Sequence, residues 1–303
     1  MLLDKKAPSR IQRSLLSVPA TAPRLFEKAA KGEADAVFID LEDSVPPGEK
    51  VRARNQAISA LKDIDWGVKA VGIRINALDT EWGLRDILDI ASQCSRLNFV
   101  LIPRVESDFD LLHVDALLGS LEREAHRAER IAIQALIETP LGLTRVETIA
   151  GSTRRLEAIS FGFGDFSIGM GTYDSVIGPG GEPWTYAIAR IATACKAYGL
   201  RAIDGPYTHY HDREGLERRA KLAAQLGFDG KWVIHPSQIP TCHAVFSPSQ
   251  EHLDWALNTL RMVRQSIATG SGATGHNGSL LDMAHVRLAE DILNRSGTSV
   301  EEN

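Results

Sequence analysis

Short apolar runs rich in β-branched residues recur along the chain, and segments with a helical spacing of apolar residues lie between them. We identify eight such runs, at residues 15–18, 36–40, 70–75, 99–102, 131–137, 156–161, 200–203 and 231–234. Strands that alternate with helices are typical of parallel βαβ units, and runs too apolar to alternate are buried on both faces. Eight of them predict a closed (β/α)8 TIM barrel. A doubly wound open sheet is the main alternative.

Amphipathic segments between the runs predict the helices of this barrel. One covers residues 23–31, and another covers residues 82–91, where Leu84, Ile87, Leu88 and Ala91 are spaced for one helical face. A longer helix is expected over residues 248–267, after the last strand. It begins at Ser247-Pro-Ser-Gln250, which has the form of a capping box.

The composition changes after this helix. Residues 268–279 carry four glycines in twelve positions and are typical of a flexible connector. Met283, Val286, Ala289 and Leu293 then recur at helical spacing, which predicts a terminal helix. We therefore expect a barrel domain over residues 1–267, followed over residues 268–303 by a glycine-rich hinge and a C-terminal helical extension.

The composition is that of an ordinary globular protein and excludes several classes. Lys and Arg number 34 against 39 Asp and Glu, and no basic block is present, so nucleic acid is not an expected partner. The chain has neither a signal-peptide pattern at its start nor a window approaching the roughly 20 apolar residues of a membrane span. We expect a cytoplasmic protein without a membrane partner. Cys94, Cys195 and Cys242 lack metal-site spacing and are expected to be buried, reduced thiols.

Polar residues end seven of the eight runs, at the barrel end where active sites lie. They are Asp40-Leu-Glu-Asp43, Arg74-Ile-Asn76, Arg104, Glu138, Gly162-Phe-Gly-Asp165, Asp204 and His235. The first group sets Asp40, Glu42 and Asp43 within four residues. Three such acids repel one another unless a cation or basic group lies among them. They could form a metal cage, a hydrogen-bonding frame or a solvated turn.

The residues at this end include acids and bases but no evident nucleophile. Neither a G-x-S-x-G elbow nor a P-loop is present, and Gly162–Ser167 lacks the third glycine of a dinucleotide fingerprint. The only lysine on a strand near the site is Lys231, at the start of its run, which disfavours a Schiff-base aldolase. The spacing in His209-Tyr-His-Asp212 is more typical of a surface cluster than of zinc. Carboxylates with arginine favour a hard divalent cation such as Mg2+ acting on a small oxyacid.

Segments in the same order resemble the HpcH/HpaI aldolase and citrate lyase β-subunit family, in particular its malyl-CoA and β-methylmalyl-CoA lyases. The resemblance covers about residues 13–294. Its segments are Arg13–Pro19, Pro23–Lys28, Asp40–Asp43, Arg74–Asn76, Ile102–Glu106, Leu136–Thr139, Phe161–Asp165, Ala202–Pro206 and Gly227–Pro236. It implies a (β/α)8 barrel that assembles into homotrimers or hexamers.

The resemblance also implies roles for individual residues. Glu138 and Asp165 would hold Mg2+, with Mn2+ as an alternative, and Arg74 would stabilise the oxyanion of the substrate. The expected contacts with substrate are Gly164, Ile234 and His235, and those with the phosphates of coenzyme A are Arg24 and Lys28. The last two residues also lie where Pro23 opens a helix, although a solvated helical face is the plainer interpretation.

Residues 275–284 resemble the family's C-terminal segment, which covers a neighbouring subunit's active site and supplies an aspartate. Here that residue would be Asp282. An aspartate before an apolar helical run is also a preferred N-cap, which is the structural alternative. We further expect Glu42 and Asp43 to act around Arg74 as functional residues, and Asp40 to be structural.

The implied activity is reversible cleavage of a 3-hydroxyacyl-CoA, such as malyl-CoA or β-methylmalyl-CoA, to acetyl-CoA or propionyl-CoA and glyoxylate. The alternatives are a malyl-CoA thioesterase, a citramalyl-CoA lyase, a citrate lyase β-like subunit that needs partners, and a CoA-independent aldolase acting on 4-hydroxy-2-oxoacids. Two departures from the malyl-CoA lyases leave the acyl preference open. Residues 166–184 form a shorter segment, and Ser17 replaces an aromatic residue that some of them carry.

Overall fold

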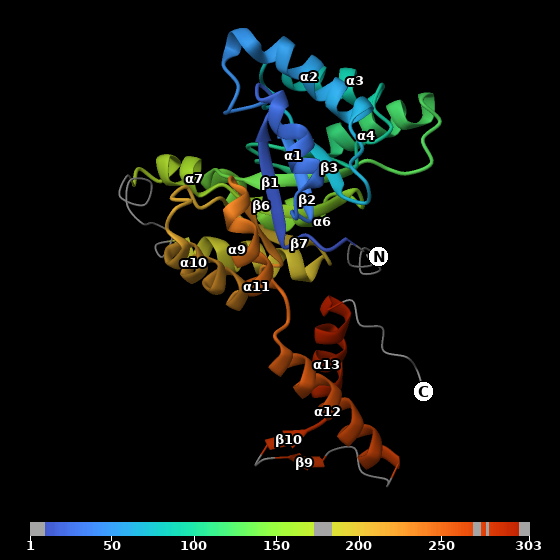
Figure 1. The fold of residues 1–303 in the computed structure, drawn as a ribbon, viewed down its shortest axis with the longest axis vertical. Coiled ribbons are helices and arrows are strands. Elements are labelled where there is room, and N and C mark those ends of the chain that lie inside the picture. The colour runs from blue at the N-terminus through green and yellow to red at the C-terminus, as the bar shows by residue number, and fades with distance from the viewer. Residues whose placement is uncertain (1–9, 173–183, 269–273, 277–278, 297–303) are drawn as a thin grey trace. The chain divides into compact units, whose positions relative to one another are not determined.

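Eight parallel strands close into a barrel in chain order, β1 to β8 (Figure 1). The computed structural model describes residues 10–172, 184–268, 274–276 and 279–296. The strands are β1 Ser14–Pro19, β2 Ala36–Asp40, β3 Ala70–Arg74, β4 Phe99–Ile102, β5 Ala132–Ile137, β6 Leu156–Phe161, β7 Arg201–Asp204 and β8 Gly230–Val233. Hydrogen bonding between β1 and β8 completes the ring. The predicted barrel and all eight strands are confirmed, and the open-sheet alternative is wrong.

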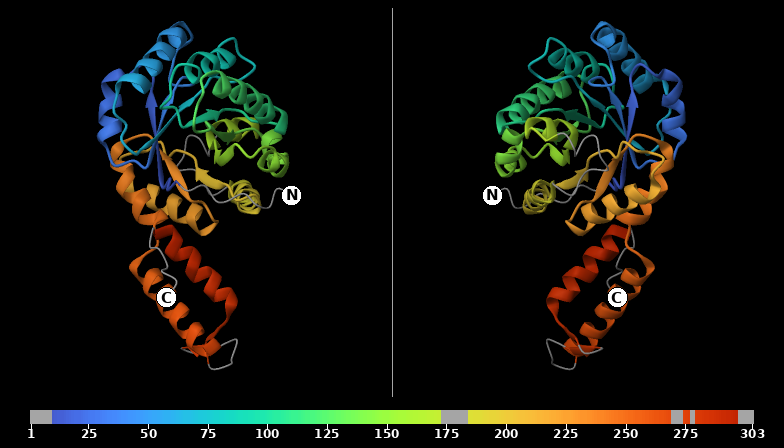
Figure 2. Two further views of the ribbon diagram at one scale, coloured as in Figure 1. Left: turned by 90° about the vertical axis from the view of Figure 1, so that its right-hand side faces the viewer. Right: turned by 90° about the vertical axis from the view of Figure 1, so that its left-hand side faces the viewer.

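Helices follow the strands and lie around the outside of the ring (Figure 2). The described helices of this part are η1 Pro23–Leu25, α1 Phe26–Lys31, η2 Pro47–Glu49, α2 Lys50–Asp63, α3 Gly83–Ala91, α4 Asp108–Glu124, α5 Pro140–Thr144, α6 Val146–Gly151, α7 Phe163–Gly169, α9 Thr185–Ala197, α10 Arg213–Gln225, η4 Pro236–Gln238 and α11 Ile239–Phe246. No described helix is long and apolar enough to cross a membrane.

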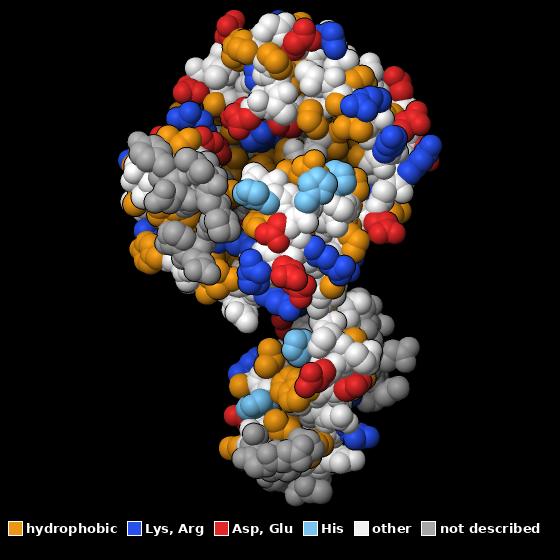
Figure 3. Space-filling model, turned by 60° about the vertical axis from the view of Figure 1, so that its left-hand side comes forward, with side chains coloured by type: hydrophobic (Ala, Val, Ile, Leu, Met, Phe, Trp, Pro, Cys, Tyr) orange, Lys and Arg blue, Asp and Glu red, His pale blue; other side chains and the backbone are white. Residues whose placement is uncertain are grey.

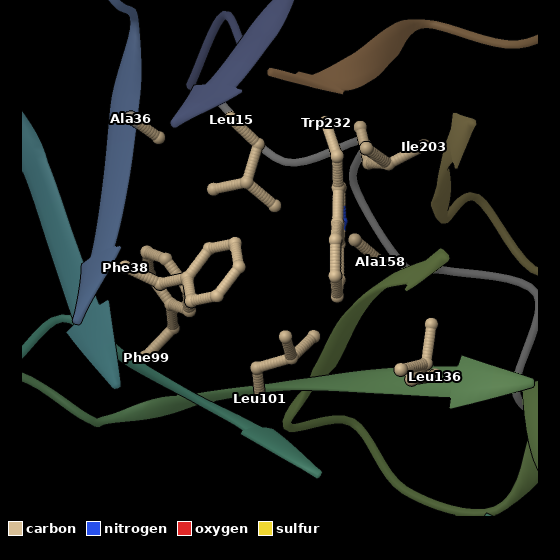
Figure 4. Close-up of a cluster of buried hydrophobic side chains, with 9 residues drawn as sticks. All are labelled: Leu15, Ala36, Phe38, Phe99, Leu101, Leu136, Ala158, Ile203 and Trp232. Atoms are coloured by element: carbon tan, nitrogen blue, oxygen red, sulfur yellow. The ribbon is translucent and has the colours of Figure 1, made fainter. Parts of the chain in front are cut away.

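Side chains from alternate strand positions fill the barrel interior (Figure 4). Phe38, Phe99 and Trp232 are the large members of this cluster, and the rings of Phe38 and Trp232 lie 4.8 Å apart. Gly72 on β3 leaves room for Phe99, because a Cβ there would lie 2.4 Å from its ring. The residues between these positions face the helices, so neighbouring residues on one strand have opposite environments.

The helix over residues 82–91 is confirmed as α3, but its buried face differs from the predicted one. Ile87 and Ala91 are buried as expected, whereas Leu84 is 43% exposed. Asp86 is buried instead, because its carboxylate accepts hydrogen bonds from the side chains of Arg54 and Asn76, both at 2.7 Å. A buried carboxylate needs hydrogen-bond donors, and because Asp86 has two, it occupies a buried position of the helix that the apolar spacing did not predict.

The chain divides into two compact units, residues 1–243 and 244–303. The second unit contains α12 Gln250–Ala268, β9 Thr274–His276, β10 Ser279–Leu281 and α13 Met283–Ser296. Ala256 and Leu260 of α12 pack on Ala289 and Leu293 of α13. The boundary therefore differs from the predicted one at residue 267, because the long helix buries its apolar face against the terminal helix.

Two local features of the second unit differ from prediction. The helix α12 is capped by Ser249 rather than Ser247: the hydroxyl of Ser249 accepts from the amide of His252 at 3.2 Å. The segment predicted as a flexible connector contains the strand β9 and the first residue of β10, its antiparallel partner, while its residues 269–273 and 277–278 lie outside the described part. In the first unit, residues 173–183, which belong to the segment 166–184 predicted to be shorter than in the malyl-CoA lyases, also lie outside the described part.

The three cysteines are buried and unpaired, as predicted. Burial raises the pKa of Cys94 to about 11 and that of Cys242 to about 12. Thiols with such pKa values stay protonated at neutral pH and are poor nucleophiles.

Candidate active site

The polar residues predicted at the carboxyl ends of the strands gather at one mouth of the barrel. Asp40, Arg74 and Asp204 are the last residues of β2, β3 and β7, and Glu138 and His235 follow β5 and β8 within two residues. Parallel strands in a closed barrel bring these ends together. Figure 3 shows acidic and histidine side chains around a hollow on one face of the first unit.

Arg74 lies at the inner face of β3, directly above the apolar core. Its guanidinium carbon is 5.6 Å from the ring centroid of Trp232 and 6.0 Å from that of Phe38. Nε and Nη2 each donate a 2.7 Å hydrogen bond to a different oxygen of Asp40. This bidentate pair fixes the plane of the guanidinium.

The other two acids of the turn meet the remaining nitrogen of Arg74. Nη1 donates to Asp43 at 3.3 Å and lies 2.8 Å from Oε2 of Glu42. The three acids thus form a frame around one arginine, which agrees with the hydrogen-bonding interpretation of this sequence. A guanidinium has five N–H groups. Three donate to Asp40 and Asp43, so the other two make no described hydrogen bond, although Nη1 is also ion-paired with Glu42.

Asp40 holds both the arginine and its own turn. Its carboxylate accepts from the amides of Glu42 at 3.0 Å and Ser44 at 3.4 Å. Burial alone would raise the pKa of Asp40, but the Arg74 guanidinium and these hydrogen bonds bring the pKa below its usual value. Asp40 is therefore a charged structural centre, as predicted.

Glu42 is the poorly satisfied member of the frame. Its Oε2 is buried and, despite the short distance to Arg74, has no hydrogen bond of acceptable geometry. Burial raises the pKa of Glu42 to about 7 against the attraction of Arg74, and Asp43, Asp40 and Asp165 add to the rise. A second positive charge beside this carboxylate would reverse that effect.

Glu138 follows β5 and is 3% exposed. Its Oε1 accepts a 2.7 Å hydrogen bond from the amide of Arg104, whose backbone has a φ of 50°. Such left-handed backbone is strained for a residue with a side chain, and here it directs the amide at Glu138. Gly162 leaves room on the other side, since a Cβ there would lie 2.5 Å from the Cβ of Glu138.

Asp165 lies in the first turn of α7, after β6, and is exposed. Burial and then the charge of Glu42 raise the pKa of Glu138, and the charge of Asp165 adds to the rise. Beside it, a Cβ on Gly164 would meet no atom within 4 Å. The backbone of this turn therefore borders open space, where a ligand could approach it.

These carboxylates have the properties of a site for a hard divalent cation. Glu138 offers oxygen ligands in a buried position, Asp165 lies close enough to repel it, and Glu42 has an orphaned oxygen. No group of three metal-binding side chains occurs among the described residues. A cation held by two carboxylates keeps several positions for water and substrate oxygens, which suits Mg2+ better than a closed structural site.

The predicted phosphate contacts lie after β1. Pro23 is the first residue of η1, as expected, and the chain continues into α1. Arg24 and Lys28 are both exposed. The helix itself is only six residues long, so the charges of these two side chains, rather than a helix terminus, would attract an anion.

The remaining predicted contacts follow β8. The amides of Ile234 and His235 both donate to the side-chain oxygen of Gln238, at 2.8 and 3.4 Å. Nδ1 of His235 accepts from the amide of Ser237 at 3.2 Å, so the neutral ring carries its proton on Nε2. The ring also stacks on Tyr210, with centroids 4.9 Å apart. His235 thus presents an oriented N–H donor.

Two disfavoured alternatives find no support in the geometry. Trp232 points into the barrel, so its neighbour Lys231 points outward, where its ammonium donates to Asp204 and to the carbonyl of Gly205, both at 2.6 Å. It is not available as a Schiff-base lysine in the mouth. Asp212 accepts from the hydroxyl of Tyr207 and the amide of Gly215 rather than completing a metal site.

Asp282 immediately precedes α13 in the second unit. Its Oδ1 accepts from the amide of Ala284 at 2.9 Å and lies 2.9 Å from Nδ1 of His285. The contact with His285 is the main cause of its lowered pKa. The capping alternative is confirmed, while the catalytic role remains a prediction.

Sequence reasoning missed several residues that organise this mouth. Lys50, Tyr210 and Gln238 were not singled out, and Arg104 was noted only as a polar strand end. Tyr210 and Arg104 contact His235 and Glu138 far along the chain, while Lys50 and Gln238 bind backbone groups of nearby turns. No short motif signals such contacts.

A closed (β/α)8 barrel whose mouth gathers buried carboxylates around an arginine defines an enzyme of the TIM-barrel class. The family model described as HpcH/HpaI aldolase/citrate lyase matches residues 13–236. The chain belongs to this family, and its class of activity is that of a carbon–carbon lyase. The family resemblance found in the sequence is thereby confirmed.

Individual relatives cover nearly the whole chain. An L-malyl-CoA/β-methylmalyl-CoA lyase of Cereibacter sphaeroides is 38% identical over 309 residues, which is 97% of each chain. A citrate lyase subunit beta of Haemophilus influenzae is 31% identical over 97% of this chain and 99% of its own. The solved structure of CitE from Mycobacterium tuberculosis, in complex with magnesium, acetoacetate and coenzyme A, is 30% identical. It covers 96% of this chain and 100% of that one, with a TM-score of 0.77.

Proposed function

We propose that this protein is a Mg2+-dependent lyase that reversibly cleaves a 3-hydroxyacyl-CoA, such as malyl-CoA or β-methylmalyl-CoA. The products are acetyl-CoA or propionyl-CoA and glyoxylate. The observation that carries the proposal is the 38% identity over 97% of both chains to a lyase of that name. The similar CitE structure, which contains magnesium and coenzyme A, supports the same cofactor and substrate class.

Glu138 and Asp165 are the proposed ligands of Mg2+, with Mn2+ as an alternative. When bound, the cation would act as a Lewis acid toward the carboxylate and hydroxyl oxygens of the substrate. The hydrogen bond from Arg104 fixes the Oε1 atom of Glu138 and leaves its other oxygen without a described hydrogen bond. Asp165 lies on the open side, where the substrate would enter.

Arg74 is the proposed oxyanion stabiliser. In cleavage, the 3-hydroxyl group loses its proton to water and its C–O bond becomes the carbonyl of glyoxylate. The bond between C2 and C3 of the acyl chain breaks, and its electron pair passes to the thioester as an enolate. The N–H groups of Arg74 that donate to neither Asp40 nor Asp43 would donate to reacting oxygens that gain negative charge. Because Asp40 fixes the guanidinium beforehand, little reorganisation is needed when that charge develops.

Asp282 is the proposed general acid that protonates the enolate carbon, and in condensation it removes the same proton as a base. We place it in a neighbouring subunit's active site, which requires a homotrimer or hexamer. Its lowered pKa suits the base of the condensing direction. Asp282→Asn should abolish turnover and leave Mg2+ affinity nearly intact. Full activity of that variant would remove Asp282 from the mechanism.

We propose that the protein binds its substrate in part through the coenzyme A group. Arg24 and Lys28 would bind its phosphates from the exposed face of η1 and α1. The backbone at Gly164, together with Ile234 and His235, would contact the acyl part. The Nε2 proton of His235 is a donor that a carboxylate or carbonyl oxygen could accept.

One product assay tests the function. The purified chain is incubated with malyl-CoA and Mg2+, and with Mg2+ removed by EDTA. Glyoxylate and acetyl-CoA in equal amounts, formed only with Mg2+, are expected. Malate and free CoA would instead identify a thioesterase. No turnover of malyl-CoA, β-methylmalyl-CoA or citramalyl-CoA would favour a citrate lyase β-like subunit, and turnover of a free 4-hydroxy-2-oxoacid would show a CoA-independent aldolase.

A further inference from the structure

Lys50, the first residue of α2, is buried beside the acidic turn and is 6% exposed. Its ammonium donates hydrogen bonds to the carbonyl of Leu41 at 2.9 Å and to that of Glu42 at 2.8 Å. It also lies 5.6 Å from the ring centroid of Trp82. The ammonium therefore binds the backbone of the turn rather than a carboxylate.

Lys50 and Asp40 hold the same turn through opposite groups. The carboxylate of Asp40 accepts from the amides of Glu42 and Ser44, whereas Lys50 donates to the carbonyls of Leu41 and Glu42. Both polar backbone groups of Glu42 are thus bound to a buried charged side chain. Such bonds are stronger than those between neutral groups.

This double attachment matters because the Glu42 side chain has little to hold it. Its Oε2 has no hydrogen bond of acceptable geometry, although it lies 2.8 Å from Nη1 of Arg74. The backbone of the turn must then determine where the carboxylate lies. A small shift of that backbone would alter the charge beside Arg74 and Glu138.

Stabilisation of α2 does not account for Lys50. A cation in the first turn opposes the helix dipole, and the ammonium bonds outside the helix. Burial also lowers the pKa of Lys50, against the attraction of Asp40 and Glu42. The buried position is therefore unfavourable for the charged lysine, and the structure that its hydrogen bonds stabilise is the turn at Leu41 and Glu42.

We propose that Lys50 is a positioning residue that fixes the backbone of Leu41 and Glu42, and thereby the carboxylate frame of Arg74. Its kinetic consequence rests on the proposed lyase function, whereas its effect on the backbone does not. The chain offers a matched control. Lys69 likewise donates to two backbone carbonyls, of Gly32 at 2.7 Å and Ala34 at 2.5 Å, just before β3 begins and so at the opposite end of the barrel.

The test compares Lys50→Met with Lys69→Met in the full chain. Hydrogen exchange gives the exchange rates of the backbone amides of Glu42 and Ser44. Steady-state kinetics give kcat and KM with malyl-CoA at saturating Mg2+. In Lys50→Met we expect exchange at least ~10-fold faster at these amides and kcat ~10- to 100-fold lower, because small misplacements of catalytic groups carry costs of that size. Lys69→Met should change neither, and Lys50→Arg should recover part of kcat.

The two readouts separate the possible failures. Unchanged exchange at Glu42 and Ser44 in Lys50→Met would overturn the proposal whatever the substrate. Faster exchange with unchanged kcat would overturn the positioning role. An equal loss of kcat in both variants would show a general effect on folding. An inactive wild-type chain with faster exchange in Lys50→Met would refute the proposed function and leave the backbone attachment standing.

Discussion

Two groups of charged side chains at the barrel differ in the direction they face and in their balance of positive and negative charge. The mouth cluster, Asp40, Glu42, Asp43, Arg74 and Glu138, has four acids around one arginine at the open end of the strands, with the ammonium of Lys50 on the backbone of the turn. The outward pair, Asp204 and Lys231 with the nearby Arg219, faces the helices and has two cations beside one acid. Each includes the last residue of a strand, Asp40 of β2 or Asp204 of β7, yet only the first has an excess of negative charge.

The pKa directions follow from this difference. Burial would raise the pKa of Asp204, but Lys231 and Arg219 lower it below its usual value. Burial and neighbouring acids raise the pKa of Glu42 and Glu138 instead. Acids that the chain leaves uncompensated are destabilised until a cation arrives. The imbalance, rather than the number of charges, distinguishes the candidate active site from a structural ion pair.

Breaking the outward pair should have the largest effect, and on stability alone. Lys231→Met leaves Asp204 buried with Arg219, at 3.5 Å, as its remaining cation, and we expect a loss of about 3–5 kcal/mol in the free energy of unfolding. The folded fraction should keep the wild-type kcat. Denaturant unfolding measures the free energy of unfolding, and kinetics normalised to the concentration of folded protein measure kcat. The double variant Lys231→Met/Asp204→Asn should recover stability, and a lower kcat without unfolding would contradict the comparison.

Weakening the mouth cluster should affect activity more than stability. Arg74→Lys keeps the charge but loses the bidentate contact with Asp40 and the remaining N–H donors. We expect kcat to fall ~10²- to 10³-fold, as for loss of an oxyanion donor. Arg155→Lys is the control, because Arg155 is equally buried and paired with Asp115 and Glu122. Equal losses of kcat in the two variants would mean that Arg74 has no special part in the reaction.

The raised pKa of Glu42, about 7, predicts a pH dependence of the metal-free protein. Between the unfolded pKa near 4.5 and the folded value, the folded state binds more protons, so stability falls as pH rises. The loss should reach up to ~3 kcal/mol by pH 7, from ~1.4 kcal/mol per pKa unit. Unfolding of the wild type and of Glu42→Gln in EDTA at pH 5 and pH 7 measures it. The same pH slope in both proteins would refute the assignment.

The smallest effect is expected at the exposed cations. Arg24→Ala and Lys28→Ala should each raise KM for the CoA ester about three- to tenfold, since exposed charge pairs contribute about 1 kcal/mol, and leave kcat unchanged. The effect should shrink as ionic strength rises. Lys31→Ala is the control, because that exposed lysine pairs with Glu27 on the same helix. An equal rise of KM in Lys31→Ala would show a general charge effect instead of a phosphate site.

The strands and the place of the site were predictable because they depend on local patterns. Runs such as residues 36–40 and 99–102 are β-branched and fully buried, and the carboxyl ends of barrel strands must gather at one mouth. The acids at Asp40 and Glu138 were therefore placed correctly. The long helix α12 was assigned to the wrong unit, because periodicity shows that a face is buried but not against what.

What sequence reasoning missed depends on three-dimensional contacts and backbone conformation rather than on residue patterns. Nothing near Lys50 indicates that its ammonium binds two carbonyls, and no pattern indicates the left-handed backbone of Arg104. The predicted buried face of α3, which included Leu84, was wrong for a similar reason. Asp86 is buried there because it accepts hydrogen bonds from Arg54 on α2 and from Asn76 after β3. At Asp282 the local rule for an N-cap was correct, and a local rule has no bearing on a role in another subunit.

The central claim is that Glu138 of the mouth cluster holds a divalent cation together with Asp165. Calorimetric titration of Mg2+ into the wild type, Glu138→Gln and Lys231→Met at one temperature and pH tests it most directly. We predict one site in the wild type and in Lys231→Met, and an affinity lower by at least ~10-fold in Glu138→Gln, as for loss of a metal-site residue. Equal affinity in the wild type and Glu138→Gln would contradict the account.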